Sequence, residues 1–324
     1  MGKTTETSTT SFTSDAPFHA FVRQTKGYRK VRYGGVCEDA AKLIRLKRGI
    51  IAAVADGHGD PSCAYADLGS AFAVEAACRV LREIYDEKDR SELCDFCAAS
   101  RDEIAQKIIL LWNELVLDDY LKKPEGDPLL SERDSLVSYI TTAFNPPAQQ
   151  ELSVDQTRAY YAKRDRIAKL RNDVAILYGT TLKALFETDE FVLCLSIGDG
   201  DVVAVEGDRV TWLCPKDDQY STATDSLCFP PQKAQKCFCH VLIRKREPGN
   251  TPVPIGFGPD YILLSTDGFR NSFPSDRHFE DCLVSLGRQK ASGFRKMKRE
   301  CTGWIERLSM DSFCGDDITL CIVY

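Results

Sequence analysis

Three apolar, strand-like runs in this chain each end on an Asp-Gly pair. The runs cover residues 50–55, 191–198 and 261–266, and the pairs that follow them are Asp56-Gly57, Asp199-Gly200 and Asp267-Gly268. Chemically active side chains are commonly carried by loops that a rigid sheet holds in place. A fold in which these strands end at one edge therefore gathers several carboxylates at one spot.

A fourth acidic site, Asp316-Asp317, stands directly before the apolar run of residues 318–323. Carboxylates that cluster without Cys or His suit hard cations such as Mg²⁺ or Mn²⁺. A single Asp-Gly pair indicates only a turn. Three of them after buried-type strands favour a metal site, and His58, within Asp56-Gly57-His58-Gly59, is a candidate catalytic acid.

The length and composition predict one globular domain. A chain of 324 residues that is 43% hydrophobic can bury a full core. We expect this single domain to span residues 16–324, with a charged insertion at about 118–173. Residues 1–15 are rich in Ser and Thr and almost free of apolar side chains, so they are predicted to form a disordered tail.

The net charge limits the kinds of binding partner that are expected, and the cysteines indicate the cellular compartment. A formal net charge of -6 and a pI near 5.4 argue against binding to nucleic acid or to an anionic membrane. The 14 Cys show no framework spacing, and the sequence shows no secretory or 18-residue apolar segment. We expect a reduced, cytoplasmic monomer. Met1-Gly2 is followed by Glu6 rather than Ser or Thr, so myristoylation is not expected.

Two groups of Cys raise the question of zinc. They are Cys94 with Cys97, and Cys237 with Cys239-His240. The first pair has helical spacing in an apolar stretch, and residues 237–243 have the composition of a strand. We predict that these side chains are structural thiols that bind no zinc, since free Cys usually packs as a small hydrophobe.

Periodicity outlines the secondary structure. Apolar residues recur at helical spacing over residues 68–84 and 104–115, and two more helices are expected between residues 275 and 308. A loop at residues 214–235 that contains Pro230-Pro231 is long enough to cover a site. Strands are expected at residues 42–46, 49–55, 180–186, 190–197, 202–205, 209–213, 236–243, 261–265 and 318–323.

Six short motifs, in this order, resemble those of the metal-dependent, type 2C Ser/Thr protein phosphatases. The likeness runs from about residue 27 to the C-terminus, and the contexts Lys26-Gly27-Tyr28 and Cys37-Glu38-Asp39-Ala40 look most like the compact bacterial branch. The motifs are Glu38-Asp39, Asp56-Gly57-His58-Gly59, Gly179-Thr180-Thr181, Gly198-Asp199, Ser265-Thr266-Asp267-Gly268 and Asp316-Asp317-Ile318-Thr319.

This resemblance implies an α+β fold, a four-layer α-β-β-α sandwich with two central, mostly antiparallel sheets. It also implies a site for two Mn²⁺ or Mg²⁺ ions at one edge of the sandwich. Asp56 would bridge both ions, and the Gly57 carbonyl would be a further ligand. Asp267 and Asp316 would complete the coordination shell of one ion, whereas Glu38 and Asp39 would hold the waters around the other.

The implied reaction is hydrolysis of phosphoserine and phosphothreonine in proteins, in signalling that opposes a Ser/Thr kinase. Two cations about 3.5 to 4 Å apart lower the pKa of a water between them and clamp the phosphoryl oxygens. A Ser or Thr alkoxide is a poor leaving group, so His58 would donate a proton to it. His58 and Asp56 are thus the expected catalytic residues.

The chain departs from the family pattern at several positions. It has Gly198-Asp199-Gly200-Asp201 where relatives usually carry Gly-Asp-Ser-Arg, and Asp317 where Asn is common. Ile176 stands where many relatives have an Asp for a third metal, and the nearby Asp173 is a poor substitute. The resemblance therefore supplies no ligand for a third ion.

The phosphate-binding Arg of several relatives has no match, because Gly34 occupies that position. Arg29 or Arg32 could replace it, or each could be a solvent-facing charge on a strand. Two other functions stay open, a catalytically silent pseudophosphatase that acts as a binding module and a phosphatase for small molecules. Retention of Asp56, Asp267 and Asp316 favours catalysis.

Overall fold

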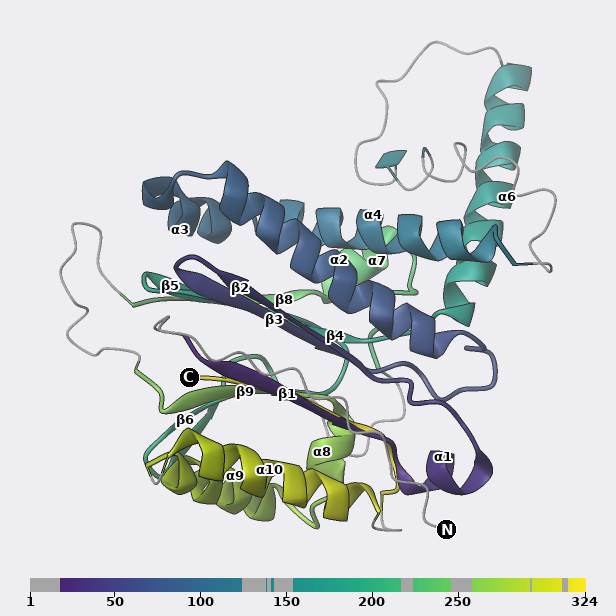
Figure 1. The fold of residues 1–324 in the computed structure, drawn as a ribbon. Helices are drawn as coiled ribbons and strands as arrows, with labels where there is room; N and C mark the ends of the chain where they lie inside the picture. The colour runs from purple at the N-terminus through teal and green to yellow at the C-terminus, as the bar shows by residue number, and fades with distance from the viewer. Residues whose placement is uncertain are drawn as a thin grey trace.

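The computed structural model describes residues 18–123, 138, 141–142, 154–216, 224–245, 258–291, 293–310 and 314–324. Two five-stranded sheets lie face to face between two layers of helices (Figure 1). Each strand pairing is antiparallel. This confirms the α+β sandwich with layers in the order α-β-β-α. The expected tail at residues 1–15 lies outside the described residues, as do residues 124–137, 139–140 and 143–153 of the insertion expected at about 118–173.

The first sheet joins the two ends of the chain. β1 (Ala20–Thr25) pairs with β10 (Ile318–Val323), and β10 pairs with β9 (Tyr261–Ser265). β6 (Asp201–Glu206) and β7 (Arg209–Trp212) complete the order β1-β10-β9-β6-β7. Residues near positions 25, 201, 265 and 318 therefore meet at one end of this sheet.

The second sheet has the order β2-β3-β4-β5-β8. Its central strands are buried at every residue, as the continuous apolar runs indicate. Alternate residues of β3 face opposite ways, so Ile51 packs toward the helices and Ala52 toward the other sheet. The strands are β2 (Ala40–Leu46), β3 (Gly49–Ala55), β4 (Leu182–Thr188), β5 (Phe191–Ile197) and β8 (Cys239–Arg244).

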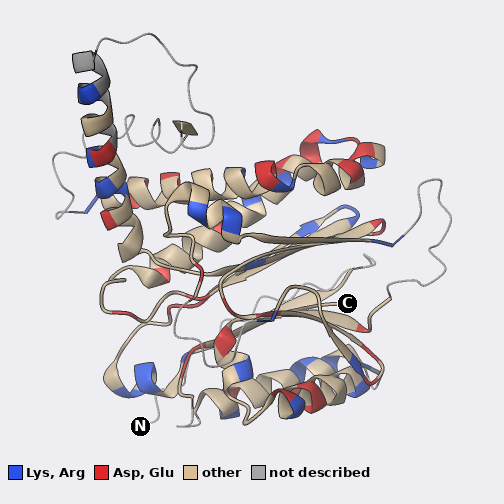
Figure 2. Ribbon diagram, turned by 180° about the vertical axis from the view of Figure 1, so that it is seen from behind, with Lys and Arg blue, Asp and Glu red and all other residues tan. Residues whose placement is uncertain are grey.

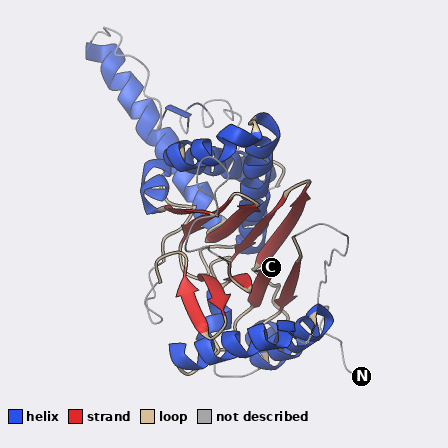
Figure 3. Cartoon of the chain, turned by 90° about the vertical axis from the view of Figure 1, so that its left-hand side faces the viewer, coloured by secondary structure: helices blue, strands red, loops and turns tan. Residues whose placement is uncertain are grey.

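Helices cover the outer face of each sheet, as the end-on view shows (Figure 3). Buried Trp112 belongs to the cluster between the second sheet and its helices, and buried Phe279 to the cluster between the first sheet and its helices. The second sheet is covered by α2 (Ala66–Glu87), α3 (Arg90–Ala99), α4 (Arg101–Tyr120), α7 (Pro231–Cys237) and the C-terminal end of α6 (Val154–Leu177), which otherwise projects away from the sandwich. The first sheet is covered by α9 (Asp276–Ala291) and α10 (Phe294–Ser309).

Two short helices lie at the edge that is on the right in Figure 1. They are α1 (Tyr28–Tyr33) and α8 (Asp267–Asn271). Neither was expected from the sequence, in which Arg29 and Arg32 were considered as strand residues and Asp267 as part of a turn. Gly34 ends α1 at a φ of 76°, a left-handed conformation that glycine adopts at little cost.

The segment from residue 214 onward also differs from its prediction. Pro231 begins α7, where proline is tolerated because a helix leaves its first N–H groups unpaired. Cys237 therefore ends a helix, and the strand begins only at Cys239. Residues 217–223 of the expected covering loop lie outside the described residues. Within the ranges that are described, no helix is both long and apolar enough to cross a membrane.

Candidate functional site

A cavity of about 320 Å³ opens at the edge of the sandwich where β3 ends and α8 begins. It brings together Glu38, Asp56, Gly57, His58, Asp267 and Asp316 from the sequence-predicted set, along with Arg29. Asp39 and Arg32 are not among its lining residues. The lining consists of Arg29, Lys30, Glu38, Asp56, Gly57, His58, Gly59, Asp199, Thr224, Asp267, Gly315 and Asp316.

The backbone of Asp56 is clamped by Thr180 and Thr181. The Asp56 N–H donates to Thr181 Oγ1 at 3.0 Å, and the Asp56 carbonyl accepts from the Thr181 N–H at 2.9 Å and from Thr180 Oγ1 at 2.8 Å. Gly57 follows in a tight gap, because a Cβ there would lie 2.5 Å from the Ala66 carbonyl oxygen. The Gly-Thr-Thr element thus fixes where the Asp56 side chain enters the cavity.

Asp267 opens α8 and lies against Asp56. The Asn271 side-chain amide donates to Asp267 Oδ2 at 2.8 Å, while Asp267 Oδ1 is buried and receives no hydrogen bond within the described residues. Burial, with the charges of Asp199 and Asp316, raises the pKa of Asp267 to about 6. Burial and the charges of Asp39 and Asp267 raise the pKa of Asp56 well above its usual range.

The donors present here fit a hard divalent cation. Burial also raises the pKa of Asp316, although the ammonium of Lys30 opposes that shift. Two contacting carboxylates cannot both stay ionised unless a cation compensates them. Across the described ranges, no three acidic, His or Cys side chains already close around one point as ligands. The carboxylates therefore share a cavity rather than a finished coordination shell.

Lys30 is a residue of this edge that the sequence did not single out. Its ammonium lies 2.7 Å from Glu38 Oε2 and 2.6 Å from Asp317 Oδ2. Burial opposes the charge of Lys30, but these two carboxylates outweigh it and raise its pKa. Asp317 also accepts the N–H groups of Gly27 at 2.8 Å and Glu38 at 2.7 Å. Asp317 thus ties the segment around α1 to the start of β10, and Lys30 balances its charge.

Glu38 and Asp39 occupy different environments. Glu38 faces the cavity, whereas Asp39 is buried behind it and accepts a hydrogen bond from Thr266 Oγ1 at 2.8 Å. Thr266 is the residue directly before α8, and its hydroxyl also accepts the Thr319 N–H at 3.0 Å. Burial and the charge of Asp317 raise the pKa of Asp39 well above its usual range.

His58 is held on both sides by the neighbouring loops. Its backbone N–H donates to the Gly179 carbonyl at 3.0 Å, and its imidazole Nε2 lies 2.8 Å from Ser226 Oγ. When the single hydroxyl hydrogen of Ser226 goes to the Thr180 carbonyl, 3.0 Å away, His58 Nε2 is the donor to Ser226. Burial lowers the pKa of His58, and the charges of Asp199 and Asp60 oppose that shift. Ser226, from the loop expected to cover the site, was not identified from the sequence.

A buried ion pair accounts for the unusual Gly198-Asp199-Gly200-Asp201 element. Arg270 Nε lies 3.1 Å from Asp201 Oδ2, and the Trp212 indole N–H donates to Asp201 Oδ1 at 3.0 Å. Asp201 and Arg270 are each 1% exposed. The chain thus has a carboxylate where relatives usually carry Arg, and a guanidinium three residues after Asp267. This pair fixes α8 to the first residue of β6.

The two candidate phosphate-binding arginines are placed differently. Arg29 lines the cavity, and its backbone N–H donates to the Gly315 carbonyl at 3.3 Å. Arg32 lies outside, where it donates to the Tyr28 hydroxyl at 3.3 Å and stacks 5.6 Å from the centre of the Tyr33 ring. Only Arg29 of these two therefore lies where an anion in the cavity could reach it.

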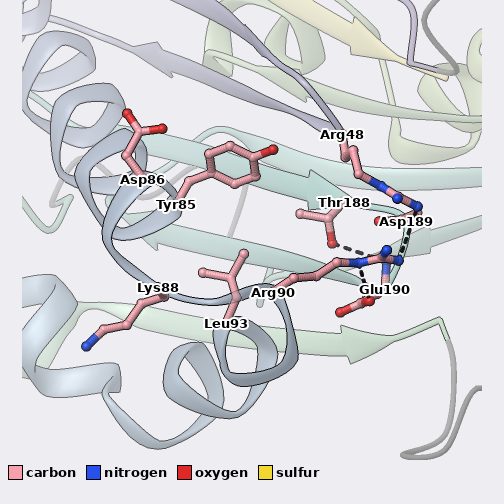
Figure 4. A pocket seen from close by; sticks show the side chains of 9 residues that line it. All are labelled: Arg48, Tyr85, Asp86, Lys88, Arg90, Leu93, Thr188, Asp189 and Glu190. Carbon is pink, nitrogen blue, oxygen red and sulfur yellow. Dashed lines mark hydrogen bonds and ion pairs between the residues drawn. The ribbon is translucent and has the colours of Figure 1, made fainter.

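A second cavity, of about 310 Å³, lies at the opposite edge of the sandwich. Arg48 precedes β3 there, at the far end of the strand that delivers Asp56. Figure 4 shows Arg90 reaching toward Asp189 and Glu190, to which its nitrogen atoms lie at 2.8 and 2.7 Å. Arg48 also pairs with Asp189.

The Cys groups considered for zinc lie away from the first cavity. Cys94 and Cys97 are buried in α3, and His240 Nε2 lies 2.9 Å from the Cys97 carbonyl oxygen. Cys237 and Cys239 are partly buried. Their role as structural thiols stays a prediction.

Comparison with known proteins identifies a family for this chain. The family model of protein phosphatase 2C matches residues 26–300. No curated protein sequence matches the chain.

Solved structures share the fold at low sequence identity. A bacterial serine phosphatase is 11% identical over 94% of this chain and 96% of its own, with a TM-score of 0.54. PppA of Pseudomonas aeruginosa, described as a key regulatory component of T6SS, is 16% identical over 94% of this chain and 96% of its own, with a TM-score of 0.51. The serine/threonine phosphatase Stp1 of Staphylococcus aureus is 11% identical over 100% of this chain and 96% of its own, with a TM-score of 0.50. At these identities the likeness shows the fold alone.

Proposed function

The chain belongs to the protein phosphatase 2C family of protein phosphatase hydrolases, and we propose that it hydrolyses phosphoserine and phosphothreonine in proteins with two divalent metal ions. One observation carries the proposal. Asp56 and Asp267 are buried against each other in a cavity that also holds Asp316, and Asp267 Oδ1 receives no hydrogen bond within the described residues. Two such carboxylates stay ionised together only when a cation compensates them, and the proposed metal ions would do so.

The residues that would hold the ions are the carboxylates of the cavity. Asp56, Asp267 and Asp316 are the proposed ligands, with the Gly57 carbonyl, and Glu38, which lines the cavity, would hold their waters. When bound, Mn²⁺ or Mg²⁺ would lower the pKa of a water and compensate the charge of the phosphate. Asp39 acts from behind the cavity wall, through its hydrogen bond to Thr266.

Arg29 would bind the phosphate of the substrate, and His58 would protonate its leaving group. The Arg29 guanidinium, at the cavity wall, would orient the phosphate through charge-assisted hydrogen bonds. Water attacks phosphorus, and the ester bond between phosphorus and the serine oxygen breaks. That oxygen takes a proton from His58, so the products are inorganic phosphate and a serine hydroxyl. Ser226 would hold the imidazole in place.

The ion pair of Lys30 with Glu38 favours a second candidate, a pseudophosphatase that binds phosphoproteins without hydrolysis. An ammonium 2.7 Å from Glu38 Oε2 competes with a cation for that carboxylate. In the described part of the chain, no Lys, Arg or His nitrogen pairs with Asp56, Asp267 or Asp316 at a comparable distance. We therefore place catalysis first.

Hydrolysis of an aryl phosphate and of a phosphoserine peptide, with Mn²⁺ or Mg²⁺ and with a chelator, tests the proposal. We expect both activities to require added metal and to be lost in Asp56→Asn. Asp189→Asn, at the opposite edge, is the matched control and should keep them. Hydrolysis that continues in chelator and in Asp56→Asn would refute the proposal. Full metal occupancy without hydrolysis of either substrate would support the pseudophosphatase.

A further inference from the structure

Exposed apolar side chains gather beside the cavity mouth. Val31 is 39% exposed, Tyr33 77% and Val36 56%. They account for three of the six large apolar side chains that are exposed in the described part of the chain, yet they fall within six residues. We call Val31, Arg32, Tyr33 and Val36 the α1 rim. On α1, Val31 and Tyr33 point to different sides, whereas Tyr33 lies one helical turn from Arg29 and on the same side. Apolar side chains that are exposed beside a site commonly mark a contact surface.

The helix that carries this rim is anchored by its backbone and by Lys30 rather than by a buried face. None of the residues of α1 is buried. Gly27, directly before the helix, packs so closely that a Cβ would lie 2.3 Å from the Asp316 carbonyl carbon. The Gly27 N–H and the Lys30 ammonium both bond to Asp317. The α1 rim is thus held at a fixed place next to the site while its side chains face outward.

Two arginines give the acidic region around the cavity mouth a local positive charge that suits a phosphorylated partner. The cavity wall holds five carboxylates against only Arg29 and Lys30, and Lys30 is paired with Glu38 and Asp317. With a net charge of -6 on the whole chain, a phosphate dianion is repelled on approach. Arg29 and Arg32 provide local positive charge, and Figure 2 shows α1 in blue beside the red, acidic loops of the site edge. A cationic and aromatic surface at an acidic mouth is complementary to a phosphopeptide.

We propose that the α1 rim is the docking surface for the part of a substrate protein that flanks its phosphorylated residue. An apolar side chain of the substrate would pack on Tyr33 and Val36 while the phosphate enters beside Arg29. Tyr33 follows Arg29 by four positions on α1, which corresponds to about 6 Å along the helix axis. An extended peptide covers that distance in about two residues. The preferred substrate therefore carries an apolar residue about two positions from the phosphoserine. This inference rests on the proposed function.

The test compares the double variant Tyr33→Ser/Val36→Ser with Tyr161→Ser, a change of an exposed tyrosine on α6 that is 54% exposed. The substrates are an aryl phosphate, a phosphoserine peptide with Leu two residues away, and the same peptide with Ala there. We expect kcat/KM of the double variant to fall about tenfold, or about 1.4 kcal/mol, on the Leu peptide alone and through KM, because the apolar contact with the Leu side chain is lost. Tyr161→Ser should match the wild type on all three substrates.

The outcomes separate this inference from the proposed function. Equal losses on all three substrates, or none on the Leu peptide, would overturn the docking surface while leaving the phosphatase in place. If the wild type hydrolyses none of them, the proposed function fails, and fluorescence anisotropy of the labelled Leu peptide decides the docking. Weaker binding by the double variant supports the surface, and equal binding overturns it. Self-association of the wild type that the double variant loses would assign the rim to a second copy and overturn the inference.

Discussion

The two edges of the sandwich hold cavities of nearly equal size, about 320 and 310 Å³, yet their charges are arranged in opposite ways. At the edge with Arg48 and Arg90, opposite charges pair and remain partly exposed, between 22 and 52% of each side chain for the pairs with Asp189. At the edge with Asp56 and Asp267, carboxylates are buried together and their pKa values are raised.

The two cavities differ in how their charges are compensated rather than in volume. An exposed ion pair contributes about 0 to 1 kcal/mol to stability, so the paired edge is explained by ordinary surface chemistry. Burying like charges side by side destabilises a fold unless a ligand compensates them. Perturbed carboxylates in a cleft are an expected sign of a functional site, and this supports the cation proposed for the first cavity.

The largest effect on stability is expected for the buried pair of Arg270 and Asp201. Arg270→Met leaves Asp201 buried without its ion-pair partner, and loss of one member of such a pair costs about 3 to 5 kcal/mol. Arg48→Met, at the exposed edge, should cost less than about 1 kcal/mol. Urea unfolding of both variants measures the contrast. Losses of similar size would show that the two edges do not differ as described.

Exchanging the acidic and basic residues of this pair tests whether its charges, rather than its side-chain shapes, stabilise the fold. The double variant Asp201→Arg/Arg270→Asp restores an ion pair and should recover part of the stability that Arg270→Met loses. Recovery of metal-dependent hydrolysis along with stability would show that the pair acts through the position of α8. A double variant no better than Arg270→Met would show that side-chain shape, rather than charge, matters there.

Removal of His58 should separate substrates by their leaving groups. His58→Ala is expected to slow hydrolysis of a phosphoserine peptide by about 10²-fold, and that of a nitrophenyl phosphate far less, because nitrophenolate leaves without a proton. Ser226→Ala should shift the two rates in the same sense by a smaller factor, since it removes the partner of His58 Nε2. Steady-state rates at saturating metal provide the test. Equal losses on both substrates would assign His58 to the organisation of the site instead.

Acid should stabilise the metal-free protein at the site edge. The pKa of Asp267 rises on folding from 3.8 to about 6, so the folded state binds more protons than the unfolded state between those values. Stability therefore falls as pH rises through this window, by about 2 to 3 kcal/mol at most for this group. Urea midpoints in chelator at pH 5 and 7.5 measure about half of this fall, roughly 1.4 kcal/mol, and Asp267→Asn should reduce it. An unchanged fall in that variant would show that Asp267 is not its source.

The smallest effect is expected at the second cavity itself. Asp189→Asn removes a carboxylate that pairs with Arg48 and Arg90, but all three side chains are partly exposed. We expect a loss of less than about 1 kcal/mol that is further reduced by salt, without change in hydrolysis. Thermal unfolding at low and high salt, beside an activity assay, measures both. A loss of hydrolysis would reveal a function at this edge that its paired charges do not indicate.

Local sequence was sufficient to predict much of the fold. β3 and β10 fall within their expected ranges because each is a continuous apolar run between polar turns. The helical period of residues 68–84 and 104–115 gives α2 and α4 in the same way. Three carboxylates of the cavity, Asp56, Asp267 and Asp316, follow from the positions at which such runs begin or end.

The remaining features depend on contacts between distant residues. Lys30 and Asp317 are separated by 287 positions and Asp201 and Arg270 by 69, so no local pattern could pair them. In the six residues of α1, helix and strand periods could not be told apart, and the helix depends on backbone contacts made by Gly27 with Asp316 and Asp317. Ser226 likewise reaches His58 through the fold of its loop onto Thr180.

Binding of Mn²⁺ at equilibrium tests the central claim, that the carboxylate edge is a divalent cation site and the paired edge is not. Electron paramagnetic resonance of free Mn²⁺ counts the bound ions in wild type, Asp56→Asn and Asp189→Asn. The account predicts two bound ions in the wild type, a loss of tight binding in Asp56→Asn, and a curve for Asp189→Asn that superimposes on the wild type. Equal binding by Asp56→Asn and the wild type, or loss of binding in Asp189→Asn instead, would contradict it.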